Sequence, residues 1–191
     1  MPKGLSGKRV AVVATDGVEQ VELTSPKRAL EGHGVKVDVI APKSGQIRAW
    51  KHTEWGERIA VDHAIDEARA DDYDALVLPG GVMNPDELRR DERVLAFVRR
   101  FFDENKPVAV ICHGPWTLID AGVVKGRHLT SYPSLKKDLQ NAGARWDDRQ
   151  VVIDGNLVSS RNPGDLPAFE DALVGLLESP PKRMRAAHPP S

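Results

Sequence analysis

The sequence contains a single cysteine, Cys112, among 191 residues and therefore cannot form an internal disulfide. It has no apolar run long enough to span a bilayer, and its first ten residues, MPKGLSGKRV, lack the apolar segment of a signal peptide. These absences predict a cytoplasmic protein with no membrane partner. In that reducing compartment its thiol would stay available for chemistry.

An excess of charge of one sign is also missing. Lys and Arg number 27 against 28 Asp and Glu, which gives a formal net charge of -1. This balance provides no strongly basic surface, so we expect no nucleic-acid partner. The six histidines are scattered, and the chain has neither a phosphate-binding loop nor a dinucleotide motif, so we expect no metal and no cofactor.

What the chain does contain is an alternation of short apolar strands and amphipathic helices. Four runs are apolar on both faces, as in a parallel sheet covered by helices: 9–15, 35–40, 75–78 and 108–111. Helices are predicted over 19–31, with a kink or break at Pro26, and over 65–70, 91–104, 134–142 and 166–177. Hairpins are expected within 43–63 and over 151–160. The pattern predicts one α/β domain over 1–191, a sandwich with a mostly parallel sheet and a loosely ordered tail over 179–191.

The stretch 107–119, PVAVICHGPWTLI, carries the main chemical signal. Its apolar strand stops at Cys112, and a helical segment begins two residues later. A strand that turns sharply into a helix projects the turn residue outward, which is the geometry of a nucleophile elbow. Backbone N–H groups at a helix start favour a thiolate. We therefore interpret Cys112 as a nucleophile, the alternative being a small buried apolar residue.

Two neighbouring features would support a reactive thiol. His113 can take the thiol proton, or it can simply pack or cap, and its backbone N–H can donate to an oxyanion in either case. Pro79-Gly80-Gly81 follows a buried strand, and the N–H of Gly81 is a candidate second oxyanion donor, the alternative being a plain turn.

Two glutamates follow the first strand, three residues apart. Because we expect this strand to lie beside the cysteine strand, Glu19 is predicted to approach the thiolate and to be protonated there, since a charged carboxylate would repel it. Glu22 is interpreted as a surface residue that complements the helix dipole.

At the level of whole motifs, the chain resembles the PfpI-type intracellular peptidases (peptidase C56-like), within the superfamily of the parkinsonism-associated redox protein. The resemblance covers about residues 8–178. It rests on five segments: VEQVEL (18–23), DALVLPGG (74–81), KPVAVICHGPWTL (106–118), LTSYPSLKKDLQNAGA (129–144) and DGNLVSSRNPGDL (154–166).

The resemblance implies a flavodoxin-like three-layer sandwich related to glutamine amidotransferase domains. It implies Cys112 as the nucleophile, Glu19 as the protonated partner of its thiolate and His113 as the adjacent base. An acid from a neighbouring subunit would orient this histidine, which implies a homodimer or higher homo-oligomer. In VMNPDEL (82–88), Asp86 is the candidate for that acid and Glu87 the fallback. SRNPGDL stands where amidotransferases have a His-x-Glu pair, which argues against glutaminase activity.

Three functions remain open at this point. The favoured one is a cysteine-dependent stress-response hydrolase that acts on small carbonyl compounds or glycated adducts, as a deglycase or glyoxalase does. The second is a non-catalytic redox sensor or stress chaperone that uses the oxidation of Cys112. The third is a peptidase with a cross-subunit triad.

Overall fold

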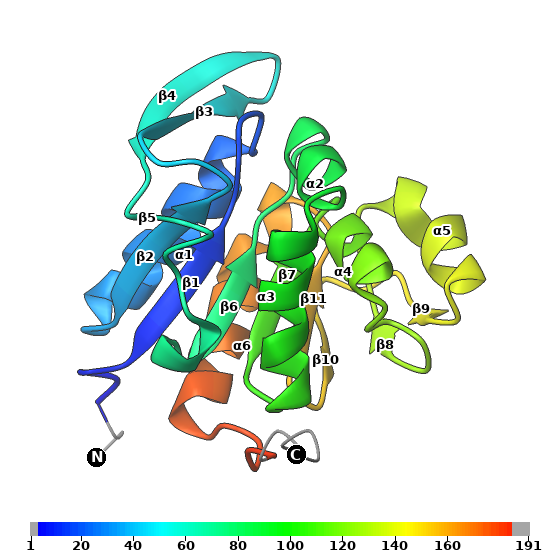
Figure 1. The fold of residues 1–191 in the computed structure, drawn as a ribbon. Helices are drawn as coiled ribbons and strands as arrows, with labels where there is room; N and C mark the ends of the chain where they lie inside the picture. Colours follow the sequence, from blue (N-terminus) through cyan, green and yellow to red (C-terminus); the bar gives the residue numbers. More distant parts are fainter. Residues whose placement is uncertain (1–3, 185–191) are drawn as a thin grey trace, which may run out of the picture.

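A seven-stranded sheet runs through the centre of the protein in the computed structural model, which describes residues 4–184 (Figure 1). The strand order is β10-β11-β7-β6-β1-β2-β5, and only the β10–β11 pair is antiparallel. The strands are β1 (Arg9–Val13), β2 (Lys36–Ala41), β5 (His63–Ala64), β6 (Ala75–Leu78), β7 (Val108–Ile111), β10 (Val152–Asp154) and β11 (Leu157–Ser160). The predicted α/β sandwich with a mostly parallel sheet is confirmed.

Helices cover both faces of this sheet. They are α1 (Gln20–Gly32), α2 (Met83–Leu88), α3 (Glu92–Asp103), α4 (Pro115–Ala121), α5 (Lys136–Asn141) and α6 (Leu166–Glu178). Short 3-10 turns occupy Ala70–Asp72, Pro133–Leu135 and Pro163–Asp165. No helix among residues 4–184 has the length and apolar character needed to cross a membrane.

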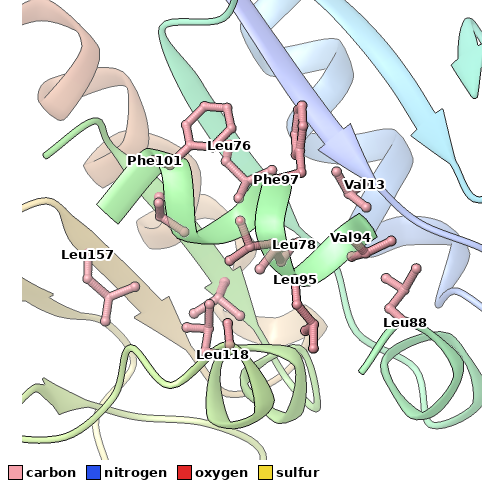
Figure 2. Packing of buried hydrophobic residues seen from close by; sticks show 14 of the residues in the cluster. Val13, Leu76, Leu78, Leu88, Val94, Leu95, Phe97, Phe101, Leu118 and Leu157 are labelled. Atoms are coloured by element: carbon pink, nitrogen blue, oxygen red, sulfur yellow. The ribbon is translucent and has the colours of Figure 1, made fainter. Parts of the chain in front are cut away.

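The two faces of the sheet build two separate hydrophobic cores. Successive strand residues point to opposite faces, so Val10 and Val12 pack with α1 and α6 while Ala11 and Val13 pack with α3 and α4. Figure 2 shows the second core, where Phe97 and Phe101 of α3 lie against Leu76 and Leu78 of β6 with Leu118 of α4 close by. Covering both faces of the sheet leaves its strand ends as the natural place for a site.

Two small sheets extend the sandwich. The predicted hairpin within 43–63 is formed by β3 (Gln46–Lys51) and β4 (Glu54–Ala60), with Trp50 and Trp55 edge to face at 5.3 Å. The N–H of Trp50 donates to the carbonyl of Val18, which holds the hairpin over the start of α1. The second small sheet pairs β8 (His128–Leu129) with β9 (Arg145–Trp146).

One local prediction is wrong, because residues 65–70 form turns before a 3-10 helix rather than a helix. The short helix α2 was not predicted. Pro26 lies inside α1, so of the two alternatives given for it, a kink or a break, the break does not occur. Packing explains the last case, because Pro26 is buried on the same face of the helix as Leu23 and Leu30. A further error concerns topology: β6 lies between β1 and β7, so the first strand does not neighbour the cysteine strand.

Part of the predicted loose tail contacts the folded body. The side chain of Asn105 donates to the carbonyl of Lys182, Arg183 pairs with Asp74, and the N–H of Met184 donates to the carbonyl of Glu104. The remainder of the tail, 185–191, lies outside the described residues.

The start of α4 lies so close to the sheet that only glycine fits at position 114. A Cβ added to Gly114 would lie 2.7 Å from Cγ2 of Val110 and 2.8 Å from the carbonyl oxygen of Leu78, whereas Gly32 at the end of α1 has nothing within 4 Å. Both glycines have backbone angles that alanine tolerates, so the difference between them is steric.

We expect Gly114→Ala to lower the free energy of unfolding by about 1 to 3 kcal/mol, because the added methyl overpacks the contact between α4 and the sheet. The matched control, Gly32→Ala, should be neutral or stabilising by up to about 1 kcal/mol. Urea unfolding of the two variants measures this difference. Equal stability of the two would show that α4 can shift away from the sheet at little cost.

Candidate active site

Cys112 lies at the tip of a sharp turn between β7 and α4. Its φ of 61° is in the left-handed region, which a residue with a Cβ adopts only at a cost in free energy. Three backbone hydrogen bonds hold the turn: Cys112 N–H to Ser160, Gly114 N–H to Ile111, and Tyr132 N–H to the carbonyl of Cys112. The strand-turn-helix geometry of a nucleophile elbow is therefore present.

A cavity of about 440 Å³ opens beside this turn, at the carboxyl ends of the central strands. The Cys112 side chain lines it, although the residue is only 7% exposed. The other lining residues come from the segments after β1 and β6, the β3–β4 hairpin and two loops: Gly17, Glu19, Glu22, Trp50, His52, Gly81, Val82, Met83, His113, Tyr132 and Pro163.

The His113 ring lies within reach of the thiol, as predicted for a base. Its Nδ1 is 3.2 Å from Sγ of Cys112. The ring stacks on Tyr132 at 4.6 Å between centroids and meets Trp116 edge to face at 5.2 Å. Burial lowers the pKa of His113, so the ring is neutral at physiological pH and can accept a proton.

The carboxyl beside the thiol belongs to Glu22, so the prediction that Glu19 takes this place is wrong. Glu22 is fully buried, and its Oε1 accepts from the N–H of Gly80 at 2.9 Å. Its carboxyl is close enough to the thiol of Cys112 for each group to affect the pKa of the other. Its other oxygen, Oε2, is buried and has no hydrogen-bond partner. Burial, aided by the charge of Glu19, raises the pKa of Glu22 to about 8, so the protonated glutamate that the chemistry calls for is Glu22.

Glu19 occupies the mouth of the cavity instead. It is the extended N-cap residue of α1, and its carboxylate accepts from the N–H of His52 at 3.1 Å. The error in the sequence interpretation follows from the strand order, since β6 and its Gly80-Gly81 turn intervene between β1 and Cys112. A signal for Glu22 was present in the sequence: it shares the i, i+4, i+8 positions with Pro26 and Leu30, the buried face of the helix.

The environment of the thiol opposes ionisation more than was predicted. Burial raises the pKa of Cys112, and the charge of an ionised Glu22 would raise it further. The N–H groups of Gly81 and His113 act in the opposite direction, because both donate to the sulfur. Below about pH 8 Glu22 keeps its proton, so the repulsion between the two groups is absent over the physiological range.

Position 81 requires glycine because of its backbone conformation and its close contacts. Its φ is +80°, and a Cβ there would lie 2.5 Å from the carbonyl oxygen of Gly17 and 2.8 Å from the nitrogen of Glu19. Only glycine can bring this N–H to the sulfur alongside the N–H of His113. Two converging donors of this kind can also receive an oxyanion that forms on an atom bonded to the sulfur.

Asp86 and Glu87 lie on α2, and both are exposed. Neither lines the cavity that holds Cys112 and His113. A role for Asp86 in orienting His113 therefore needs a second copy of the chain and stays a prediction. Within residues 4–184, no group of three or more His, Cys, Asp or Glu side chains is arranged to hold a metal ion.

Sequence reasoning missed one polar neighbour of the histidine. Oγ of Ser134 lies 3.3 Å from Nε2 of His113, on the side of the ring away from the sulfur. Its only signal was a hydroxyl residue in the TSYPS segment (130–134), which follows the elbow helix in sequence.

Fold and site together define an α/β protein built around a buried, strained cysteine with a histidine and a protonated glutamate. The chain belongs to the DJ-1/PfpI family, whose pattern matches residues 8–176. It is 47% identical over 170 residues to a deglycase of Pyrococcus abyssi (89% of this chain, 99% of that protein) and 41% identical over 173 residues to general stress protein 18 of Bacillus subtilis (90% and 99%). Among solved structures, Drosophila melanogaster DJ-1beta matches with a TM-score of 0.81 and 30% identity, covering 90% of this chain and 91% of that one.

Glu22→Gln tests the buried proton. The folded protein keeps Glu22 protonated up to about pH 8, whereas the unfolded chain releases this proton near about pH 4.3. Wild-type stability should therefore fall as the pH rises between these values. The glutamine variant has no such proton to lose, so it should be the more stable protein at pH 8, by on the order of 4 to 5 kcal/mol. The difference should vanish toward pH 4.

Urea unfolding at pH 4.5, 6 and 8 measures this effect. Glu19→Gln is the matched control, because it keeps the buried carboxyl of Glu22 and removes only a minor cause of its raised pKa. Its stability should follow nearly the same pH dependence as that of wild type. If the difference in unfolding free energy between wild type and Glu22→Gln stays constant across this pH range, Glu22 does not carry a buried proton.

Proposed function

We propose that the protein is a cysteine-dependent enzyme that acts on small carbonyl compounds or on their adducts with amines, in the cytoplasm where its thiol stays reduced. The observation that carries this proposal is the convergence on one sulfur of a neutral histidine at 3.2 Å and two backbone N–H donors, inside a cavity of about 440 Å³. Membership of the DJ-1/PfpI family and the deglycase name of the Pyrococcus abyssi relative support it.

The chemistry begins with addition of the thiol to an aldehyde. The Sγ–C bond forms as His113 Nδ1 takes the thiol proton, and the negative oxygen is received by the N–H groups of Gly81 and His113. Transfer of the former aldehyde proton to the neighbouring carbonyl carbon converts the adduct into a thioester. Water then cleaves the thioester to a hydroxy acid and restores the thiol. The net change is the addition of one water, so no external oxidant or reductant is needed.

The cavity suits a small substrate better than a folded polypeptide. Apolar side chains of Trp50, Met83 and Tyr132 line it, and the sulfur lies at a buried turn. A three-carbon dicarbonyl, or the same group attached to a flexible side chain, can reach such a site. A peptide backbone would require the mouth to widen, so we favour a small carbonyl substrate over a peptide.

We also propose that the protein forms a homodimer or a higher homo-oligomer. Val82, Met83 and Tyr132 are each at least 40% exposed, and all three also line the active-site cavity. An apolar rim of this kind is typical of a surface that a partner covers. A second copy on this rim is also what the predicted cross-subunit role of Asp86 requires.

Methylglyoxal turnover tests the proposed enzyme. Wild type should convert it to lactate, and Cys112→Ala should abolish measurable turnover, because the carbon–sulfur bond cannot form. Circular dichroism and the unfolding midpoint of the variant control for folding. Equal rates for the two proteins would refute the enzymatic proposal.

One observation favours a second function, a redox sensor. Oε2 of Glu22 is buried without a hydrogen-bond partner, in a carboxyl close enough to Cys112 to affect the pKa of its thiol. When protonated, this carboxyl can donate to an oxidised sulfur. Mild peroxide should then oxidise Cys112 to a stable sulfinic acid, and Glu22→Gln should change the yield of that product several-fold. Intact-mass spectrometry reads this directly. An identical oxidation pattern in the two proteins would argue against the sensor.

A further inference from the structure

One buried side chain outside the cavity holds the loop that carries the N–H of Gly81. Asn84 lies in α2, is fully buried and is not among the residues that line the cavity. Its Nδ2 donates to the carbonyl oxygens of Pro79 and Gly80, both at 3.0 Å. Its Oδ1 accepts from the N–H of Thr15 at 2.8 Å. Both amide hydrogens and the amide oxygen are therefore engaged.

These partners fix the orientation of the Asn84 amide. Its nitrogen faces two carbonyl oxygens and its oxygen faces an N–H group, so exchanging the two atoms would set like groups against each other in all three contacts. Because the side chain is fully buried, water cannot relieve such contacts. The two carbonyls of the loop are thus tied through Asn84 to Thr15, just beyond the end of β1.

The hydrogen bond to Gly80 determines where the N–H of Gly81 points. The carbonyl of Gly80 and the N–H of Gly81 belong to one planar trans peptide, so they point in opposite directions. The carbonyl accepts from Asn84 and, at 3.3 Å, from the N–H of Glu19. With its carbonyl held there, the peptide presents its N–H to the sulfur of Cys112.

The loop itself cannot supply this restraint. Glycine flanks the peptide on both sides, and no Cβ opposes its rotation. A side chain is excluded at both positions, since a Cβ on Gly80 would lie 2.6 Å from Cβ of Cys112 and a Cβ on Gly81 would lie 2.5 Å from the carbonyl oxygen of Gly17. A rotated peptide would turn the Gly80 carbonyl oxygen toward the sulfur, where it would repel an oxyanion. The restraint must therefore come from outside the loop.

We propose that Asn84 is a positioning residue that holds the Gly80–Gly81 peptide with its N–H toward Cys112 and so keeps this oxyanion donor in place. The inference rests on the proposed function, in which that N–H receives the negative oxygen of the substrate. Asn84 acts through Gly81, because it does not reach the cavity. It is fully buried, so a second copy on the cavity rim would not contact it.

The first test compares Asn84→Ala with Asn156→Ala. Asn156 is the matched control, because it is only 2% exposed and its Nδ2 also donates to a backbone carbonyl, that of Lys106 at 2.8 Å. Both variants should lose stability. Only Asn84→Ala should lower kcat for methylglyoxal, by roughly 10- to 100-fold with KM little changed, since complete loss of an oxyanion donor costs about 100- to 1000-fold and the peptide would be rotated only part of the time.

Asn84→Asp separates the two donors from the rest of the side chain. It is nearly isosteric and still accepts from the N–H of Thr15, but its carboxylate has no hydrogen for Pro79 or Gly80. At pH 8 its kcat should be as low as that of Asn84→Ala. Protonation returns one donor, so its kcat relative to wild type should rise as the pH falls. This variant supplies the test if the alanine variant does not fold.

Two further measurements do not depend on methylglyoxal being a substrate. Cys112→Ser changes the acceptor of the Gly81 N–H, so in proton–nitrogen NMR it should move the Gly81 amide resonance in the wild-type background and hardly at all in Asn84→Ala. Alkylation of Cys112 by iodoacetamide at a fixed pH should be several-fold slower in Asn84→Ala, because loss of an N–H donor raises the pKa of the thiol. Asn156→Ala should match wild type in both.

The outcomes separate this inference from the proposed function. If no protein in the set turns over methylglyoxal but the NMR and alkylation effects are present, the substrate is refuted and the positioning role is supported. A Gly81 resonance that responds equally to Cys112→Ser with and without Asn84 overturns the inference. So does a kcat of Asn84→Ala equal to that of Asn156→Ala, or an Asn84→Asp variant that matches wild type at pH 8, because Asn84 would then only join α2 to β1.

Discussion

The structure depends on a single constraint: a thiol must be brought to the surface of a cavity from the end of a strand that is buried on both faces. β7 lies inside the sheet between β6 and β11, so its side chains belong to the two cores. Only a sharp reversal at Cys112, with φ of 61°, releases the chain from the sheet within one residue. Glycine at position 114 follows from the same reversal, because α4 must start against the ends of β6 and β7.

Placing the sulfur so deep has an electrostatic consequence. Desolvation penalises charge on Cys112 and on Glu22 alike, so the pair cannot easily carry two negative charges. A proton retained on Glu22 leaves one charge at most, and the N–H groups of Gly81 and His113 are placed to receive it on the sulfur. The thiolate of this site is thus best described as a state that forms during proton transfer to His113, rather than as a thiol permanently ionised by a helix terminus.

Most of the fold could be predicted from periodicity, because the buried strands are apolar on both faces and the helices carry apolar stripes. The elbow was predictable for the same reason: an apolar strand stops at Cys112 and a glycine and a proline follow. The choice between Glu19 and Glu22 was not settled by these local patterns, since it depends on which strand lies beside β7. Strand order is set by long-range packing, and β6 takes that place. The turn at 65–70 was mistaken for a helix and the short helix α2 was not predicted. Segments of one or two turns take their shape from tertiary contacts rather than from local sequence patterns.

The nature of the group behind the histidine determines what the site can do. A carboxylate on Nε2, such as the one predicted for Asp86 of a neighbouring subunit, would stabilise the imidazolium and thereby favour a standing thiolate–imidazolium ion pair. Within one chain Nε2 lies beside the hydroxyl of Ser134, which adds little stabilisation to the charge of the ring, so a site without that carboxylate stays neutral at rest. A neutral resting thiol reacts slowly with indiscriminate oxidants and alkylating agents. It can still add to a strongly electrophilic carbonyl once the oxygen of that carbonyl is held by the two N–H groups.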